Sequence, residues 1–328
     1  MDEGRRPTPP ASLRGRRLEL SPGQAPPGIR RDPRQVRAVG RAILDWGAEG
    51  APGSRRPHLP WRATRDPWAV LVSEVMAQQT GVERVVPAYH RFLGAFPTPA
   101  VCAASPLADV VRAWRGLGYN RRARDLHRAA RLMVADHGGR VPADLDGLLG
   151  LPGVGPYTAR AVLAFAFGAD VGVVDTNAGR VISRAVAGRP VGAAEAQRLV
   201  DAMVPPGGGW GFGQALLDLG ATVCTARAPA CRTCPIRRRC RWRGGGGSPP
   251  DPATGSAGVS GGQSRFEGSD RQGRGRLVDA LRWGRLRSDQ VAAAAGWPDD
   301  PERAGRVAAG LVADGLVARD RSGTLRLP

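Results

Sequence analysis

Apolar residues recur three and four positions apart through most of the first two thirds of the chain, as in Val110, Val111 and Trp114. This spacing puts apolar side chains on one face of a helix, and alternating strand-like patterns are scarce in the same region. The pattern predicts a series of short helices at residues 34–47, 67–79, 82–94, 107–116, 121–137, 144–149, 157–167, 178–187, 194–203 and 211–223. We therefore expect one all-α domain over residues 34–243.

The remaining segments differ in composition from this helical region. Residues 1–33 are rich in arginine, proline and glycine, which is typical of a disordered basic arm. Residues 244–270 have the glycine, serine and proline content of a flexible linker. Residues 271–328 regain periodicity, and three helices followed by a hairpin predict a winged-helix-like module there. Such modules bind DNA in some proteins and other proteins elsewhere.

The charge of the chain indicates a polyanionic partner. The sequence has 328 residues, 48 basic against 29 acidic, a net charge of +19 and a pI near 11.4, and every basic residue is arginine. A coding bias accounts for arginine over lysine but not for the surplus of positive charge, which favours nucleic acid binding. No apolar run approaches the ~20 residues of a membrane span. The N-terminus lacks a secretory segment, so we expect a cytoplasmic protein, associated with the nucleoid if bacterial, with no membrane partner.

Four cysteines form a compact cluster with the spacing C-x6-C-x2-C-x5-C, at Cys224, Cys231, Cys234 and Cys240. Four thiolates in so short a stretch can converge on one metal centre. Zinc accepts four sulfurs but usually uses two short knuckles, and only one is present, so a [4Fe-4S] cluster fits better. Disulfides or buried thiols are the alternative, and arginines around the cluster and the reducing compartment oppose disulfides. Cys102 lies in an apolar stretch and is expected to be plain core.

Residues 151–161, with the sequence LPGVGPYTARA, predict a tight turn between two helices. Gly153 and Gly155 have no Cβ, so their backbone N–H groups can approach an anion such as a DNA phosphate, next to a helix N-terminus. A lone G-x-G is usually only a connector between helices. The full string ahead of four cysteines resembles the helix–hairpin–helix of the DNA glycosylase superfamily that includes endonuclease III.

Asp175 follows the apolar residues Gly172, Val173 and Val174 and precedes a predicted helix. An aspartate in this position is more often a helix N-cap than a catalyst, and it can be both. The resemblance implies that Asp175 is the catalytic carboxylate that these glycosylases share. A carboxylate there stabilises the positively charged sugar that forms as the base departs, or orients the attacking water.

Glu74 is the one acid in a helix that is otherwise nearly all apolar, WAVLVSEVMAQQT at residues 68–80. A carboxyl in such surroundings is expected to have a raised pKa and to remain protonated long enough to act as a general acid. The segment resembles the SEVMLQQT signature of adenine DNA glycosylases, the MutY family. Endonuclease III has no acid at this place.

The resemblance covers roughly residues 34–243 and implies roles around a base-binding pocket. Glu74 would protonate adenine at N7, and Asp175 would face the sugar. Arg62 would orient Glu74, and Tyr157 and Asn177 would support the pocket. Because the N-glycosidic bond cannot be reached inside the duplex, the adenine must be flipped out of the helix.

On the DNA side, the resemblance implies that Gln79 and Thr80 contact the opposing damaged guanine and that Tyr119 wedges into the base stack. Gly153 and Gly155 would bind a phosphate. The expected partner is therefore duplex DNA that contains a mispaired adenine, opposite 8-oxoguanine or guanine. Many members carry a further nucleotide-hydrolase-like domain, which about 55 C-terminal residues are too few to form.

The absence of lysine bears on the reaction type. Bifunctional glycosylases of this superfamily use a lysine amine to form a Schiff base and then cleave the strand. This chain contains no lysine, and the corresponding neighbourhood offers Tyr157. We therefore expect a monofunctional glycosylase that uses water. Two alternatives remain at this point: a mismatch thymine or uracil glycosylase, and a non-catalytic DNA-binding regulator.

Overall fold

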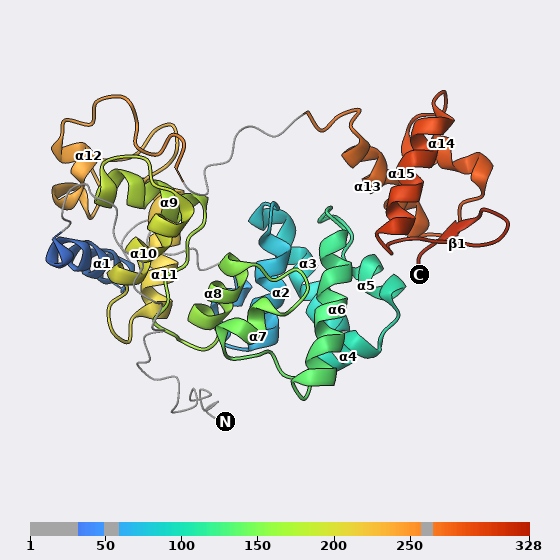
Figure 1. The fold of residues 1–328 in the computed structure, drawn as a ribbon, viewed down its shortest axis with the longest axis horizontal. Coiled ribbons are helices and arrows are strands. Elements are labelled where there is room, and N and C mark those ends of the chain that lie inside the picture. The colour runs from blue at the N-terminus through green and yellow to red at the C-terminus, as the bar shows by residue number, and fades with distance from the viewer. Residues whose placement is uncertain (1–31, 49–58, 257–264) are drawn as a thin grey trace. The chain divides into compact units, whose positions relative to one another are not determined.

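The structure is a computed structural model that describes residues 32–48, 59–256 and 265–328, and its regular secondary structure is mostly helical, with little strand (Figure 1). The expected all-α class is confirmed. The chain divides into two compact units, each assembled from two separate stretches. The first unit comprises residues 1–65 and 156–261, and the second comprises residues 66–155 and 262–328. The basic arm expected at residues 1–33 lies almost entirely outside the described residues.

The first unit is built around one hydrophobic core. Its helices are α1 (Pro33–Ala48), α8 (Pro156–Phe165), α9 (Thr176–Ile182), α10 (Ala193–Met203), α11 (Gly209–Asp218) and α12 (Arg241–Gly244). Ile43 of α1, Val200 of α10 and Phe212 of α11 are fully buried in this core. Helices α9 and α11 each run on into a turn of π-helix, Ser183–Ala187 and Leu219–Val223. Such turns are rare and frequently lie at functional sites.

The second unit contains the helices α2 (Pro67–Ala77), α3 (Val82–Ala95), α4 (Pro99–Ala104), α5 (Leu107–Ala113), α6 (Arg121–Asp136) and α7 (Leu145–Leu149). Helix α2 starts where Asp66 accepts a hydrogen bond of 2.7 Å from the backbone N–H of Ala69, with proline at the first helical position. Its residues from Trp68 to Met76 are all buried. Helix α4 was not predicted, because six residues are too few to show a period, and it holds Cys102 fully buried in the core.

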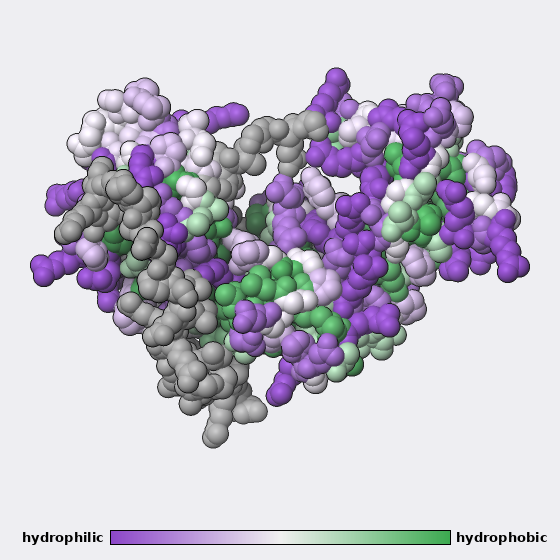
Figure 2. Space-filling view, in the orientation of Figure 1, coloured by the Kyte–Doolittle hydropathy of each residue, from purple (hydrophilic) through white to green (hydrophobic). Residues whose placement is uncertain are grey.

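The C-terminal part of the second unit follows the predicted order of three helices and a hairpin. Its elements are α13 (Asp270–Leu281), α14 (Val291–Ala295), α15 (Pro301–Ala313), β1 (Ala318–Arg319) and β2 (Leu325–Arg326). The two strands pair antiparallel, and Leu286 forms an additional bridge to Leu325. We call the described residues 265–328 the C-terminal module. Hydrophilic residues cover much of its surface in Figure 2.

Part of the segment whose composition predicts a flexible linker is packed. Asp251 forms an ion pair of 2.5 Å with Arg184, whose side chain is 2% exposed, and Ala253 and Ser256 are buried. Composition missed this because the ion pair joins residues far apart in the sequence. Residues 257–264 lie outside the described part of the chain. No helix among the described residues is both long and apolar enough to cross a membrane.

Candidate active site

Glu74 lies in the middle of α2 and is only 8% exposed. Its helix neighbours Ser73 and Val75 are buried as well, and the Ser73 hydroxyl is occupied within the helix by a 2.7 Å bond to the Val70 carbonyl. The carboxyl is therefore held in a largely desolvated position by a helix that is buried along nearly its whole length.

Two residues at the surface of the second unit have strained backbones. Gln79, just after α2, has φ of 56°, and Tyr119, just before α6, has φ of 47°. Positive φ is uncommon outside glycine and costs on the order of 1–3 kcal/mol, so it persists where the surroundings enforce it, often at binding sites. Tyr119 is 41% exposed. These are two of the three residues for which the sequence predicts contacts with the DNA bases.

Arg122 anchors both strained loops through hydrogen bonds. Its buried guanidinium donates a 2.6 Å bond to the Gln78 carbonyl and a 2.9 Å bond to the Thr80 hydroxyl, next to bonds to the carbonyls of Leu117 and Gly118. Burial lowers the pKa of Arg122 to about 10. Sequence reasoning missed this residue, although it is in helical phase with the buried face of α6.

The structure places the Thr80 side chain between the two strained loops. Its side chain is buried, and its hydroxyl accepts from Arg122 and also bonds to the carbonyls of Gln78 and Leu117. The expected contact of Thr80 with the opposing base stays a prediction. Thr80 links the loop after α2 to the loop before α6.

We expect Arg122→Met to lower the stability of the protein by about 3 kcal/mol or more, because several buried carbonyl oxygens lose their donor. Binding to mispair-containing DNA should weaken as well, because both strained loops lose their anchor. The matched control is Arg131→Met, at an exposed position of the same helix. Thermal unfolding and DNA-binding titrations check both effects, and equal losses in the two variants would contradict this role for Arg122.

The turn between α7 and α8 has the glycine geometry that the sequence predicts. Gly153 has φ of +78°, and the Val154 N–H donates to the Leu151 carbonyl at 3.1 Å, which closes the turn. A Cβ on Gly153 would meet the Cβ of Asp125 at 3.0 Å, whereas a Cβ on Gly155 would meet nothing within 4 Å. The backbone conformation and the nearby Asp125 therefore require glycine at position 153, whereas the space around Gly155 would accept a side chain. Both glycines are exposed.

This difference gives a paired prediction. Gly153→Ala should lower stability by about 1–3 kcal/mol, because alanine at positive φ is strained. Gly155→Ala should leave stability within about 0.5 kcal/mol, as for an open surface position. It should still weaken DNA binding, because the new methyl group would lie where the sequence predicts that a phosphate approaches the backbone N–H groups. Thermal unfolding and DNA titration of both variants provide the test. If Gly155→Ala bound DNA like the unmodified protein, this turn would not be a phosphate site.

In the first unit, Asp175 is the N-cap of α9. Its carboxylate accepts a hydrogen bond of 2.7 Å from the backbone N–H of Ala178 and one of 2.8 Å from the side-chain amide of Asn177. Burial raises its pKa above the usual 3.8, and these two hydrogen bonds oppose the rise. Asn177 therefore supports Asp175 directly, and the cap also fixes the direction of the carboxylate.

A chain of hydrogen bonds connects Asp175 to the first cysteine of the cluster. The guanidinium of Arg180 donates three hydrogen bonds. They go to the Asn177 side-chain oxygen at 2.8 Å, the Gly220 carbonyl at 2.5 Å and the Cys224 carbonyl at 2.7 Å. Arg180 lies one helical turn beyond Asn177, so a single buried side chain joins the carboxylate's partner to the cysteine loop. This link spans more than 40 residues of sequence and has no local signal.

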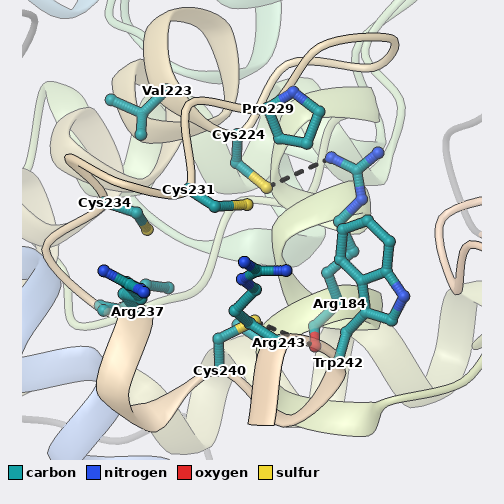
Figure 3. A pocket seen from close by; sticks show the side chains of 12 residues that line it. Arg184, Val223, Cys224, Pro229, Cys231, Cys234, Arg237, Cys240, Trp242 and Arg243 are labelled. Carbon is teal, nitrogen blue, oxygen red and sulfur yellow. Dashed lines mark hydrogen bonds between the residues drawn. The ribbon is translucent and has the colours of Figure 1, made fainter. Parts of the chain in front are cut away.

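The four predicted cysteines line one pocket (Figure 3), together with Arg184, Arg237, Trp242 and Arg243. The Arg184 guanidinium donates to the Cys224 Sγ at 3.5 Å. Burial raises the pKa of Cys234 to about 11, and it raises the pKa of Cys224 and Cys240 as well, with the Arg184 hydrogen bond opposing the rise at Cys224. Among the described residues, no three His, Cys, Asp or Glu side chains are arranged to hold a single metal ion.

Other predicted pocket residues are placed as follows. Arg62 makes two hydrogen bonds of 2.7 Å to Asp218, a fully buried carboxylate on α11. Tyr157 is half-buried in the first turn of α8. Sequence reasoning did not single out Asp218. Like Glu74, Asp218 is an acid within an apolar helix, and this pattern could have identified it. The orientation of Glu74 by Arg62 stays a prediction.

The helical fold, the hairpin and the cysteine loop define a base-excision repair protein of the helix–hairpin–helix class. The family model "HhH-GPD superfamily base excision DNA repair protein" matches residues 72–206. Similar solved structures are a thermostable thymine-DNA glycosylase, at 29% identity and a TM-score of 0.58 over 65% of this chain and 98% of that one, and an endonuclease III–DNA complex, at 27% and 0.54 over 64% and 95%.

Relatives of known type identify the family within this class. The adenine DNA glycosylase of Mycolicibacterium smegmatis is 43% identical over 276 residues, which are 83% of this chain and 92% of that protein. The human adenine DNA glycosylase is 38% identical over 65% of this chain and 41% of its own length. The chain belongs to the adenine DNA glycosylase family, and the resemblance identified from its motifs is confirmed.

Proposed function

We propose that this protein hydrolyses the N-glycosidic bond of adenine mispaired with 8-oxoguanine or guanine in duplex DNA, and that it leaves an abasic site without cutting the strand. The observation that carries this proposal is the buried Glu74, the one acid in an apolar helix whose sequence resembles the adenine-specific signature. A DNA-binding regulator has no use for a desolvated carboxyl of this kind. A reducing compartment that contains DNA suits both the substrate and the cysteine loop.

In the proposed mechanism, Glu74 protonates N7 of the flipped adenine, which turns a poor leaving group into a neutral base. As the C1′–N9 bond breaks, positive charge develops on the sugar, and the Asp175 carboxylate stabilises it. Water then adds to C1′ and loses a proton. No lysine is present to form a Schiff base with the sugar, so the abasic site remains intact.

The cysteine pocket fits a [4Fe-4S] cluster. Cys224, Cys231, Cys234 and Cys240 line one pocket, so that pocket offers four thiolate ligands. Four cysteine thiolates are the usual ligands of such a cluster, whereas zinc usually takes two short knuckles and this loop has one. Its structural contribution when bound is to brace the loop from Cys224 to Cys240, where Arg232, Arg237, Arg238 and Arg239 supply charge for DNA phosphates.

The cluster assignment predicts four iron and four sulfide per chain, and no zinc, in protein purified without oxygen. Cys234→Ser should lower iron content and thermal stability together, because the loop loses its brace. The control is Cys102→Ala, which removes a thiol outside the pocket. Elemental analysis and electron paramagnetic resonance of the oxidised protein provide the readouts. Stoichiometric zinc without sulfide would contradict the assignment.

The function is tested by single-turnover incubation with duplexes that hold adenine opposite 8-oxoguanine, guanine or thymine. A further duplex should hold thymine opposite guanine, because a thymine-DNA glycosylase is among the similar structures. We expect strand breaks at adenine opposite 8-oxoguanine and guanine only after treatment with hot alkali. Breaks without alkali would contradict the monofunctional mechanism, and excision of thymine would favour the mismatch thymine glycosylase.

A further inference from the structure

Residues 248–256 follow the last cysteine of the pocket, and we call them the post-cysteine segment. The indole N–H of Trp242 donates a hydrogen bond of 3.1 Å to the carbonyl of Ser248, where the segment begins. Further along, the backbone N–H of Ala253 donates 2.9 Å to the Asp251 carboxylate, and Ala253 itself is only 6% exposed. The segment is therefore packed, and it holds the Asp251 carboxylate in a fixed position. The adenine chemistry proposed above assigns no role to it.

Arg184 connects the post-cysteine segment to the cysteine pocket. Its guanidinium makes two hydrogen bonds to the Asp251 carboxylate, of 2.9 Å and 2.5 Å. The same guanidinium donates to the Cys224 Sγ at 3.5 Å (Figure 3). It also donates to the carbonyls of Thr225 and Ala226, at 2.7 Å and 3.0 Å. One side chain therefore joins the segment to the first cysteine and to the two residues that follow it.

Burial makes the position of the Arg184 guanidinium depend on its carboxylate partner. The Arg184 side chain is 2% exposed, and its guanidinium carbon lies 5.0 Å from the centroid of the Trp242 ring. A buried charge that loses its partner is strongly destabilised where it lies, so it moves toward water where its side chain can. Because the Asp251 carboxylate is that partner, its loss should also loosen the hydrogen bond from Arg184 to Cys224.

We propose that Asp251 is a positioning residue of the cysteine pocket, which holds the Arg184 guanidinium against Cys224 and so slows loss of the bound cluster. Thiolate ligands carry negative charge, and a donor N–H beside one of them stabilises that charge. Groups that orient metal ligands without binding the metal contribute strongly to metal retention. The proposal rests on the cluster assignment made as part of the proposed function. It makes the segment after the last cysteine a part of the metal site.

The rate of iron loss tests this in full-length protein purified without oxygen, with its cluster loaded. A coloured iron chelator is added, and iron release is followed by absorbance. We expect Asp251→Asn to lose iron about tenfold faster than the unmodified protein. Asp251→Glu keeps a carboxylate and should restore most of the slower rate. The matched control, Asp45→Asn, removes an exposed aspartate of α1 in the same unit and should release iron at the original rate.

A double-mutant cycle determines whether Asp251 acts through Arg184. In an Arg184→Met background, Asp251→Asn should speed iron loss by less than about twofold, because the guanidinium that it holds is gone. The reduction potential gives a second readout, which a purely structural role would not move. Arg184→Met removes a positive charge and a hydrogen-bond donor beside a thiolate, so the potential of the cluster should fall, and it should stay unchanged in Asp45→Asn.

Two results would overturn the proposal. The first is iron loss from Asp251→Asn at the rate of the unmodified protein. The second is an accelerating effect of Asp251→Asn that persists undiminished in the Arg184→Met background. Adenine release and iron content of the unmodified protein are scored separately. A protein that holds iron and releases adenine but gives either result would refute this inference alone, whereas a protein without iron would refute the cluster assignment together with it.

Discussion

Glu74→Gln should abolish detectable adenine release, with a single-turnover rate at least about a thousandfold below that of the unmodified protein. Glutamine preserves the size of the side chain but cannot transfer a proton to adenine N7. The buried position should tolerate this uncharged side chain, so folding should be little affected. Base release should be measured under single-turnover conditions with saturating protein.

The control for Glu74→Gln is affinity for the same duplex, which should stay within about threefold of the original because the phosphate contacts are untouched. Loss of binding and of base release in equal measure would point to a structural role for Glu74. Retained base release would remove Glu74 from the mechanism and reopen the choice among other glycosylases.

Asp175→Asn should reduce the rate of adenine release about a hundredfold to a thousandfold, because the developing charge on the sugar loses its carboxylate. Asparagine is also a good N-cap, so the hydrogen bond from the Ala178 N–H is retained and α9 should keep its stability. Thermal unfolding separates the two roles. A large loss of stability together with activity would assign Asp175 to capping alone.

The acid side of the pH dependence of base release follows from Asp175. Because burial raises the pKa of Asp175, its carboxylate is lost at a higher pH than an ordinary aspartate, and activity should fall as pH drops through that raised pKa. The effect on stability has the opposite sign. The folded state holds this proton more tightly than the unfolded chain, so ionisation of Asp175 costs stability as pH rises through the raised pKa. A rate profile in Asp175→Asn without the acid limb would confirm the assignment.

Local patterns in the sequence predicted most of the helices, and they singled out Glu74 and the cysteine loop as candidate functional residues. Glu74 stands out because its neighbours along one helix are apolar, and Asp175 stands out because it follows an apolar run and precedes a helix. In both cases the signal lies within a few residues of the side chain.

Long-range hydrogen bonds were not predictable in the same way. Arg122 and Arg180 look like the many other arginines of this chain, yet each is buried and donates to carbonyl oxygens 40 or more residues away. Thr80 was assigned to DNA because it follows Gln79, and only the structure shows that its hydroxyl is engaged by Arg122. The packed position of Asp251 was hidden for the same reason, since its partner Arg184 lies 67 residues away.

Adenine glycosylase activity is established by measuring free adenine after one turnover of the cluster-loaded protein on adenine opposite 8-oxoguanine. Chromatographic detection of the base does not depend on strand cleavage. The result predicted here is one adenine released per duplex, with the strand intact until alkali is added and no release by Glu74→Gln. Absence of free adenine from the unmodified protein, on a duplex that it binds, would contradict the assignment as an adenine glycosylase.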